Sequence, residues 1–588
     1  MTVVDAEWDQ SAATSATETA DAGRSQFARW GLTSHDVLVL TAGVLFCVGS
    51  GPFEFRTWTL RMATLLAGLP LGMVLLVRLA WRRDRAAIAA VVFLTWAMVG
   101  AAASEAPWRS FLGQVNGNSQ SVLIFAGVFG FWALARSLSD RGRALVGPVI
   151  VAALGVSTLV GVLQVVVGVQ SGPLASAGGR ANGLEGNAAY FSAPLCGAVA
   201  WCATVSEAAI VARSRLLAVA GVVFFALGIG LSGTRVSIVA IAVVIAMLCF
   251  RARNMRSVFV AAAAIVGLGS SLVVQQLFLS SSIRSGASSV ERFSSVGTEG
   301  RIEVWKAGLS AFRDRPILGW GLGRVRVGIQ HHFTPDFVRL FQTDDRNYAW
   351  TDVHNVLVQM LVAVGIVGVV LLAVFVVLAF RKVDFGLALA AVAISINWLL
   401  QPAVISSLAV AAIFLGAAAR RLVPTRPTGG RSRTATISAV VVGLTAALAL
   451  VAADVHLRLA VQQDQMAGIR SAAAWFGDDP FVIDEFVLGT YQQHLASDQP
   501  ARVAAARRAV AAEPDVPIWW NELAMTQWDS GDLAGMRASI AKALELQPNH
   551  IRSWVQLTAY AKHVGDVQLE RLARTHACGL GAPVCEQP

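Results

Sequence analysis

Two segments of the chain combine residue types that could transfer a charged group. Residues 300–323 (GRIEVWKAGLSAFRDRPILGWGLG) place Arg301 one helical turn before Trp305 and then break into a glycine-rich turn. Residues 351–368 (TDVHNVLVQMLVAVGIVG) place His354 at the mouth of an apolar helix. Arginine grips phosphate oxygens in pairs, and histidine exchanges a proton near neutral pH. These residue types suit a site that binds an anion and moves a proton.

Two further arginines lie in short loops. Arg180 begins RANGLEGN (residues 180–187), and Arg235 ends SGTR (residues 232–235). Each arginine, including Arg301, could instead reach lipid headgroups from a helix end. His354 could be a capping or interfacial residue, so the simple alternatives stay open at this point.

Several neighbours could support such a site. Asn187 precedes an apolar segment and could simply cap it. Asp352 could cap the next apolar segment or orient His354. For Asn355 we expect a structural role. Trp305 shares a helix face with Arg301.

Other polar residues nearby favour simpler interpretations. Glu299 and Glu303 flank Arg301 as helix-surface charges, although Glu303 could contact an acceptor sugar. His331 and His332 are adjacent, but no acidic residue or cysteine stands at metal-ligand spacing. We therefore expect neither a metal nor another cofactor.

The composition requires a membrane around these residues. Of 588 residues, 55% are hydrophobic and 14% charged, and the mean hydropathy is +0.60. A soluble domain has about 25% charged residues, whereas a spanning helix needs about 20 mostly apolar ones. We expect an all-α polytopic bundle of about 12–13 spans, near 36–53, 58–80, 86–103, 120–138, 145–169, 187–205, 216–233, 235–250, 257–279, 353–380, 384–400, 403–419 and 435–453.

The positive charges set the expected orientation. The net charge is +10, but the basic clusters lie in short loops between apolar segments, a pattern that orients membrane proteins and does not indicate nucleic-acid binding. With a cytoplasmic N-terminus, every dense cluster falls on the cytoplasmic side: 82–85, 136–143, 213–215, 251–256, 381–382 and 420–433. The opposite face then carries loops 104–119 and 170–186, the turn at 232–235 and the long loop 280–352, which predicts a lid or a site.

Three regions follow along the chain. Residues 1–35 are polar and are expected to form a disordered cytoplasmic tail. Residues 36–453 form the membrane domain, including the long loop 280–352. Residues 454–588 are expected to form an extracytoplasmic helical repeat domain.

A spacing of 34 residues marks this last region. Pro480, Pro514 and Pro548 are 34 apart, and the same offset relates Trp520 to Trp554, Leu523 to Leu557, Gly531 to Gly565 and Asp532 to Asp566. The pattern resembles tetratricopeptide repeats, whose helical hairpins must stack to bury their apolar faces. Such a domain could bind a protein partner.

The six cysteines divide into two groups. Cys47, Cys196, Cys202 and Cys249 lie in apolar segments and are expected to pack as small hydrophobic residues. Cys578 and Cys585 flank a stretch with Gly579, Gly581 and Pro583, so they form a possible disulfide. The alternative is two free thiols at the chain end.

Taken in order, the motifs resemble the O-antigen ligase and Wzy-type polymerase family. The family pattern is roughly Arg, Trp, Pro-x-x-Gly-x-Gly, then His-Asn and a glycine-broken helix, matched here by Arg301, Trp305, Pro316, Gly319, Gly321, His354 and Asn355. RANGLEGN resembles the family's Gly-Asn loop and SGTR its Ser-Arg turn, so the likeness spans about residues 36–420. One departure is that GQVNGNSQS (residues 113–121) lacks the arginine common in the family, and Arg109 lies earlier in that loop.

The resemblance implies a metal-independent glycosyltransferase of the GT-C class in the inner (plasma) membrane. A glycan on a polyprenyl diphosphate would move to a hydroxyl of a lipid, glycan or protein acceptor. Arg180, Arg235 and Arg301 would hold the diphosphate, and His354 would assist the hydroxyl.

Two other classes remain open, a transporter and a non-catalytic scaffold anchored in the membrane. A transporter would place its site near the bilayer midplane between repeats, and an anchor needs few spans. Convergence of Arg180, Arg235, Arg301 and His354 in one cavity would favour the enzyme.

Overall fold

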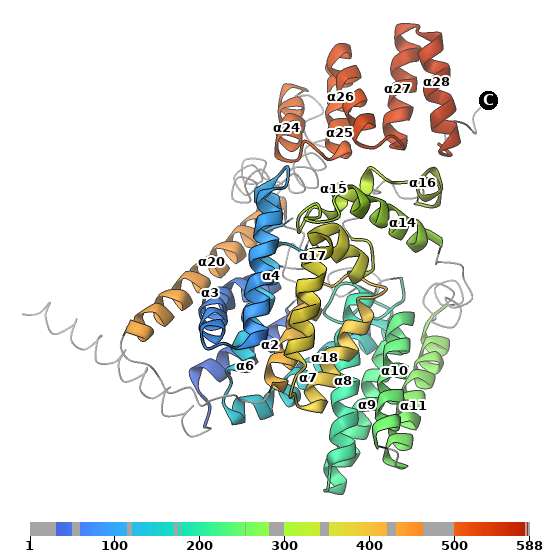
Figure 1. The fold of residues 1–588 in the computed structure, drawn as a ribbon. Helices are drawn as coiled ribbons and strands as arrows, with labels where there is room; N and C mark the ends of the chain where they lie inside the picture. Colours follow the sequence, from blue (N-terminus) through green and yellow to red (C-terminus); the bar gives the residue numbers. More distant parts are fainter. Residues whose placement is uncertain are drawn as a thin grey trace, which may run out of the picture.

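The computed structural model describes residues 31–49, 59–113, 120–169, 175–176, 178–252, 255–280, 299–341, 352–419, 431–462, 499–582 and 585. Within these ranges the regular elements are helices (Figure 1). The expected tail is described only from Gly31, and the partial first repeat around Pro480 lies outside the described residues. The all-α fold predicted from the sequence is confirmed.

Thirteen apolar helices match the predicted segments in order. They are α2 (Ser34–Val48), α3 (Thr59–Trp81), α4 (Arg85–Ala102), α6 (Val122–Arg136), α7 (Asp140–Val166), α8 (Ala188–Ala208), α9 (Ala212–Ser232), α10 (Arg235–Ala252), α11 (Met255–Phe278), α17 (Val356–Ala379), α18 (Phe385–Asn397), α19 (Ile405–Ala418) and α20 (Arg431–Gln462). Eight of the described helices are long and apolar enough to cross a membrane, and four more are shorter apolar helices. The chain is therefore a multi-pass membrane bundle, and the count of 12–13 spans stays a prediction.

Described residues at or next to several basic clusters contact one another at one end of the bundle, here called the basic end. Arg136 Nη2 lies 2.5 Å from the carboxylate of Asp84, and Arg143 Nη1 donates to the Ala419 carbonyl at 2.6 Å. Arg251 lies over the ring of Phe385, 4.2 Å from its centroid. Contacts between loops far apart in sequence agree with the alternation of basic and non-basic loops.

Small residues allow close helix packing in the bundle. A Cβ at Gly72 of α3 would lie 2.6 Å from Gly130 Cα of α6, so only glycine fits this crossing. On another face of α6, Trp132 is almost fully buried, and its ring packs edge-on against Phe375 of α17. The tightly packed bundle gives the loops at the opposite end a rigid base.

Three helices lie at that opposite end, where the sequence predicted a long loop. They are α14 (Glu299–Asp314), α15 (Val325–Gln330) and α16 (Pro335–Phe341). The short α5 (Pro107–Leu112) lies nearby. Figure 1 shows α14, α15 and α16 between the bundle and the C-terminal helices.

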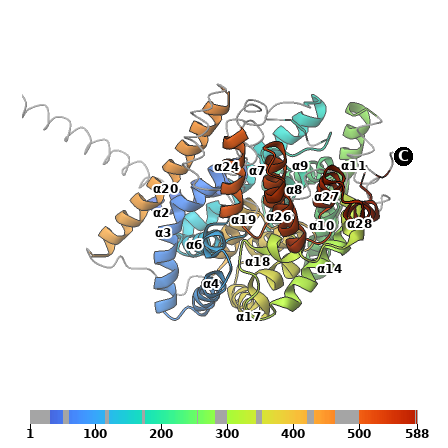
Figure 2. The ribbon, with the colours of Figure 1, turned by 90° about the horizontal axis from the view of Figure 1, so that it is seen from above.

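In the part of the C-terminal domain that the structure describes, the helices are α24 (Gln499–Ala512), α25 (Pro517–Asp529), α26 (Leu533–Leu546), α27 (Ile551–Val564) and α28 (Val567–Gly579). Seen from above, its helices lie in front of the bundle (Figure 2).

Contacts within this domain repeat with the predicted spacing. Trp520 Nε1 donates to the Pro514 carbonyl and Trp554 Nε1 to the Pro548 carbonyl, both at 2.7 Å. Asp532 caps α26 as Asp566 caps α28. The likeness to tetratricopeptide repeats itself stays a prediction.

Candidate functional site

The glycine-rich turn of the first motif docks on a break in α17. Trp320 N donates to the Val362 carbonyl at 2.8 Å, and Gly321 N donates to the Ala363 carbonyl at 2.9 Å. Gly365 interrupts α17 with φ +66°, and a Cβ there would collide with the Ile317 carbonyl oxygen. The freed backbone groups of α17 therefore bond to the turn. This contact explains why Pro-x-x-Gly-x-Gly and a glycine-broken helix occur together.

His354 is held in an unusual backbone conformation directly before α17. Its φ is +56°, a left-handed conformation that is uncommon for residues other than glycine. Asp352 Oδ1 accepts a hydrogen bond from His354 N at 2.5 Å, and His354 Nδ1 lies 3.1 Å from the Asp352 carbonyl. Residues kept in sparsely populated conformations are typical of functional sites.

Asn355, not Asp352, caps α17. Its side-chain oxygen accepts hydrogen bonds from Leu357 N at 3.0 Å and Val358 N at 3.2 Å. Of the two roles open to Asp352, the geometry therefore selects the one that orients His354.

Burial changes the protonation of both residues. It lowers the pKa of His354 to about 4, assisted by the positive charge of Arg301 and opposed by the hydrogen bond to Asp352. Burial also raises the pKa of Asp352 to about 7, against the lowering effect of the His354 N–H. At neutral pH the imidazole is therefore neutral and able to accept a proton.

Arg301 and Trp305 lie on α14, which packs against the start of α17. Trp305 Nε1 donates to the Val353 carbonyl at 3.0 Å, next to His354. The charge of Arg301 is close enough to act on His354. Thus the two segments singled out in the sequence meet in the fold.

Arg180 and Arg235 form a second group around the turn between α9 and α10. Arg180 Nε donates to the Ser232 carbonyl at 2.7 Å, and its Nη2 donates to Thr234 Oγ1 at 3.3 Å. Arg235 follows Thr234 as the first residue of α10. The two sequence motifs that hold these arginines are therefore neighbours.

The start of α8 lies between the two groups. Asn187 caps α8 through Ala189 N at 2.8 Å, as its simpler interpretation predicted. Thr234 Oγ1 donates to the Ala188 carbonyl at 3.3 Å, and Tyr190 is close enough to Asp352 to feel its charge. Arg180 is thus linked through Thr234 to the start of α8, while convergence of the arginines and His354 on one ligand stays a proposal.

Sequence reasoning missed the residues that fix the RANGLEGN loop. Arg61 of α3 is fully buried, and its Nη2 lies 3.0 Å from Glu185 Oε1 and 3.2 Å from the Leu184 carbonyl. Gln164 Oε1 accepts hydrogen bonds from Asn182 N and Gly183 N. A charged residue inside an apolar segment, such as Arg61, is the signal that could have identified this support.

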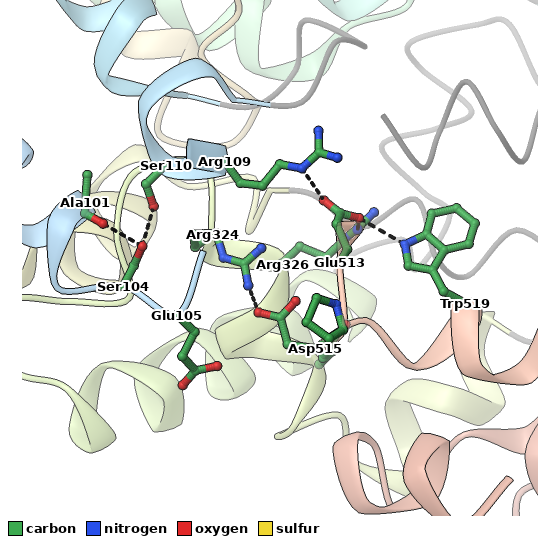
Figure 3. A network of polar contacts seen from close by, with 12 residues as sticks. Ala101, Ser104, Glu105, Arg109, Ser110, Arg324, Arg326, Glu513, Asp515 and Trp519 are labelled. Atoms are coloured by element: carbon green, nitrogen blue, oxygen red, sulfur yellow. Dashed lines mark hydrogen bonds and ion pairs between the residues drawn. The ribbon is translucent and has the colours of Figure 1, made fainter. Parts of the chain in front are cut away.

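Other candidates have structural partners. Glu303 pairs with Lys306 and accepts a hydrogen bond from Thr334. His331 stacks on Trp320, and His332 lies 2.7 Å from Asp314. Arg109 lies 3.9 Å from Glu513 of the C-terminal domain (Figure 3), so this interaction directs it toward that domain.

The structure places Cys578 and Cys585 in a disulfide. Cys47, Cys196, Cys202 and Cys249 are free thiols. The bridge joins Cys578, in the last turn of α28, to Cys585 after the end of that helix.

Comparison with known proteins supports the site region. No curated protein matches the chain. Residues 220–373 match the family model described as O-Antigen ligase. The matched region includes Arg235, Arg301 and His354, and ends within α17. Residues 220–373 of the chain are therefore similar to the O-antigen ligase family.

Proposed function

We propose that the chain transfers or polymerises a glycan from a polyprenyl-diphosphate donor onto an acceptor hydroxyl at the extracytoplasmic membrane face. The carrying observation is that α14, which bears Arg301, contacts Val353 next to His354 through Trp305, inside the region that matches the O-antigen ligase model. The basic end lies opposite α14 to α16, which supports an extracytoplasmic position for the site.

The reaction needs a cation for the departing diphosphate. The acceptor oxygen forms a bond to the anomeric carbon, the bond from that carbon to the diphosphate oxygen breaks, and the polyprenyl diphosphate leaves with both electrons. Arg301 would bind the phosphate oxygens, joined by Arg180 and Arg235 across the start of α8. A charge-assisted hydrogen bond of this kind contributes about 1.5–3 kcal/mol.

The hydroxyl proton needs an acceptor, and His354 is placed for this role. Its imidazole is neutral at pH 7 because its pKa is low. A diphosphate bound to Arg301 would offset the positive charge that contributes to that low pKa. Donor binding would therefore make His354 a stronger base when the hydroxyl attacks.

The test measures glycan transfer by purified protein in liposomes with a lipid-linked donor. Arg301→Ala should reduce transfer about tenfold to a hundredfold, and Arg301→Lys should not restore it because a point charge lacks the planar fork. His354→Ala should reduce turnover about a hundredfold or more with donor binding retained.

Arg313→Ala is the matched control, since Arg313 is an exposed arginine on the same helix. It should transfer glycan as the wild type does. Full activity of both Arg301→Ala and His354→Ala, at equal expression, would end this mechanism.

A further inference from the structure

A buried cluster of charges joins the membrane domain to the C-terminal domain. Arg326 Nη2 lies 2.7 Å from Glu513 Oε2, and Arg324 pairs with Asp515. Arg109 approaches the other oxygen of Glu513 (Figure 3). Glu513 is 2% exposed, so the fold has removed this carboxylate from water. Three arginines from one domain thus face two carboxylates from the other.

Neighbouring contacts fix this cluster. Trp519 Nε1 donates to Glu513 Oε2 at 3.0 Å, and Gln330 Nε2 donates to the Asp515 carbonyl at 2.6 Å. Val327 of α15 packs in one apolar cluster with Trp519. Burial alone would raise the pKa of Glu513, but the surrounding arginines and Trp519 lower it overall. The carboxylate is therefore charged at neutral pH and is held in place by several donors.

The same domain also holds the far end of the α15–α16 segment. Asn549 Nδ2 donates to the Phe333 carbonyl at 2.8 Å, and Arg339 Nε donates to the Gly579 carbonyl at 2.9 Å. The segment is thus attached to the C-terminal domain along residues 326–339.

This segment in turn touches α14 close to Arg301. Thr334 Oγ1 donates to Glu303 Oε2 at 2.7 Å, and Glu303 lies two residues after Arg301. Phe337 of α16 is almost fully buried. A path of direct contacts therefore connects the C-terminal domain to the helix that carries Arg301.

We propose that the C-terminal domain is a fixed part of the transfer site, and that Glu513 is a positioning residue that acts on Arg301 through the α15–α16 segment. This inference rests on the proposed function. It assigns the domain a role in setting the site geometry in addition to any partner that it binds. Charge reversal at Glu513 should release the segment and let α14 move relative to His354.

The experiment uses the full chain with Glu513→Arg, alone and combined with Arg326→Glu. Glu513→Arg should lower transfer more than tenfold, and the double exchange should restore part of it, because one charge pair is re-formed in reverse while Arg109 and Trp519 still face position 513. Cysteines at Phe333 and Asn549, joined by a short bismaleimide, report docking independently of transfer. Cross-linking should fall in the single variant and return in the double exchange.

A double-mutant cycle then tests the route through Arg301. Glu513→Arg combined with Arg301→Ala should be no worse than Arg301→Ala alone, because both changes remove the same contribution. If the losses of transfer from Glu513→Arg and Arg301→Ala multiply, this inference is overturned. It is also overturned if cross-linking falls while transfer is unchanged. Either outcome leaves the proposed function standing. Wild-type transfer by both Arg301→Ala and His354→Ala overturns both. The control is Glu545→Arg on α26, whose partner Lys542 is solvent-accessible and which should change neither readout.

Discussion

Residues 299–341 are held on two sides by different chemistry. Toward the membrane bundle, the contact joins backbone to backbone, with Trp320 and Gly321 bonded to the break in α17. Toward the C-terminal domain, it joins charged side chains, with Arg324 and Arg326 against two buried carboxylates. The first contact depends on the absence of side chains, whereas the second depends on two specific pairs.

The difference predicts different failures. The backbone contact at Gly365 tolerates no added atom, because a Cβ there would collide with the Ile317 carbonyl oxygen of a turn that is hydrogen-bonded to α17. A charged contact loses most when one partner is removed and the other remains buried. Substitutions on the two sides should therefore separate folding of the bundle from docking of the domain.

The largest expected effect is at Gly365. Gly365→Ala adds a Cβ at φ +66° that meets the Ile317 carbonyl, and should destabilise the protein by at least about 4 kcal/mol. Thermal unfolding in detergent and the yield in membranes measure this. Gly269→Ala, in helix α11 with nothing within 4 Å of the added atom, should leave both unchanged.

Removal of one charge from the contact with the C-terminal domain should destabilise the protein less. Arg326→Ala leaves Glu513 buried and should cost about 3 kcal/mol, at the lower end for a broken buried pair because Arg324 and Arg109 remain. Unfolding in detergent, with cross-linking between the domains, checks this value. Lys542→Ala, which breaks an exposed pair in the C-terminal domain, is the comparison. Equal effects of the two variants would contradict a stabilising role for the cluster.

Loss of the hydrogen bond from His354 N to Asp352 should reduce stability by an intermediate amount. Asp352→Ala leaves His354 N without its acceptor and should cost about 2 kcal/mol, with loss of turnover as the left-handed conformation relaxes. Asp352→Asn keeps an oxygen at that position and should retain most activity. Similar activity of the two variants would indicate that this hydrogen bond is dispensable for transfer.

Asp352 also predicts a pH dependence of stability. Its folded pKa of about 7 lies above the ordinary value of 3.8, so the native state binds this proton more tightly than the unfolded chain. Stability from this group is therefore full below pH 3.8 and is lost as the pH rises through 7. Asp352→Asn should reduce the fall in unfolding temperature between about pH 4 and pH 7, the window between the two pKa values.

The smallest expected effect is at Trp305. Trp305→Phe removes the hydrogen bond to the Val353 carbonyl and should cost about 1 kcal/mol. Trp108→Phe, on an exposed side chain of α5, should cost nothing measurable. An effect at Trp305 as large as that at Arg326 would show that the α14–α17 contact relies on side chains after all.

For residues 299–341, the sequence predicted the motifs on the side that faces the membrane bundle, because these motifs depend on local pattern. Long apolar segments indicated the bundle, and the spacing of Pro316, Gly319, Gly321 and Gly365 marked the motif that proved to be one contact. A glycine leaves a recognisable mark because few other residues can adopt its conformation. His354 could also be identified from the sequence, because it stands directly before the apolar segment that contains Gly365.

The other side could not be predicted from the sequence. Arg326 and Glu513 are ordinary charged residues, 187 positions apart, and nothing in either local sequence indicates the partner. Arg61 is marked by its place inside an apolar segment, but nothing in its local sequence indicates that Glu185 is its partner. Pairs of this kind depend on the completed fold, and only their burial distinguishes them from surface charges.

The separation of Arg326 and Glu513 also has a consequence during synthesis. At about 5–20 residues per second, the ribosome adds the 187 intervening residues in about 10–40 s. Throughout this interval Arg326 has been synthesised while Glu513 does not yet exist, and α17 to α20 of the membrane domain are added within it. Docking of the C-terminal domain therefore comes after synthesis of the membrane domain, and a truncated chain that stops before Glu513 would expose a cluster of cations to chaperones and proteases.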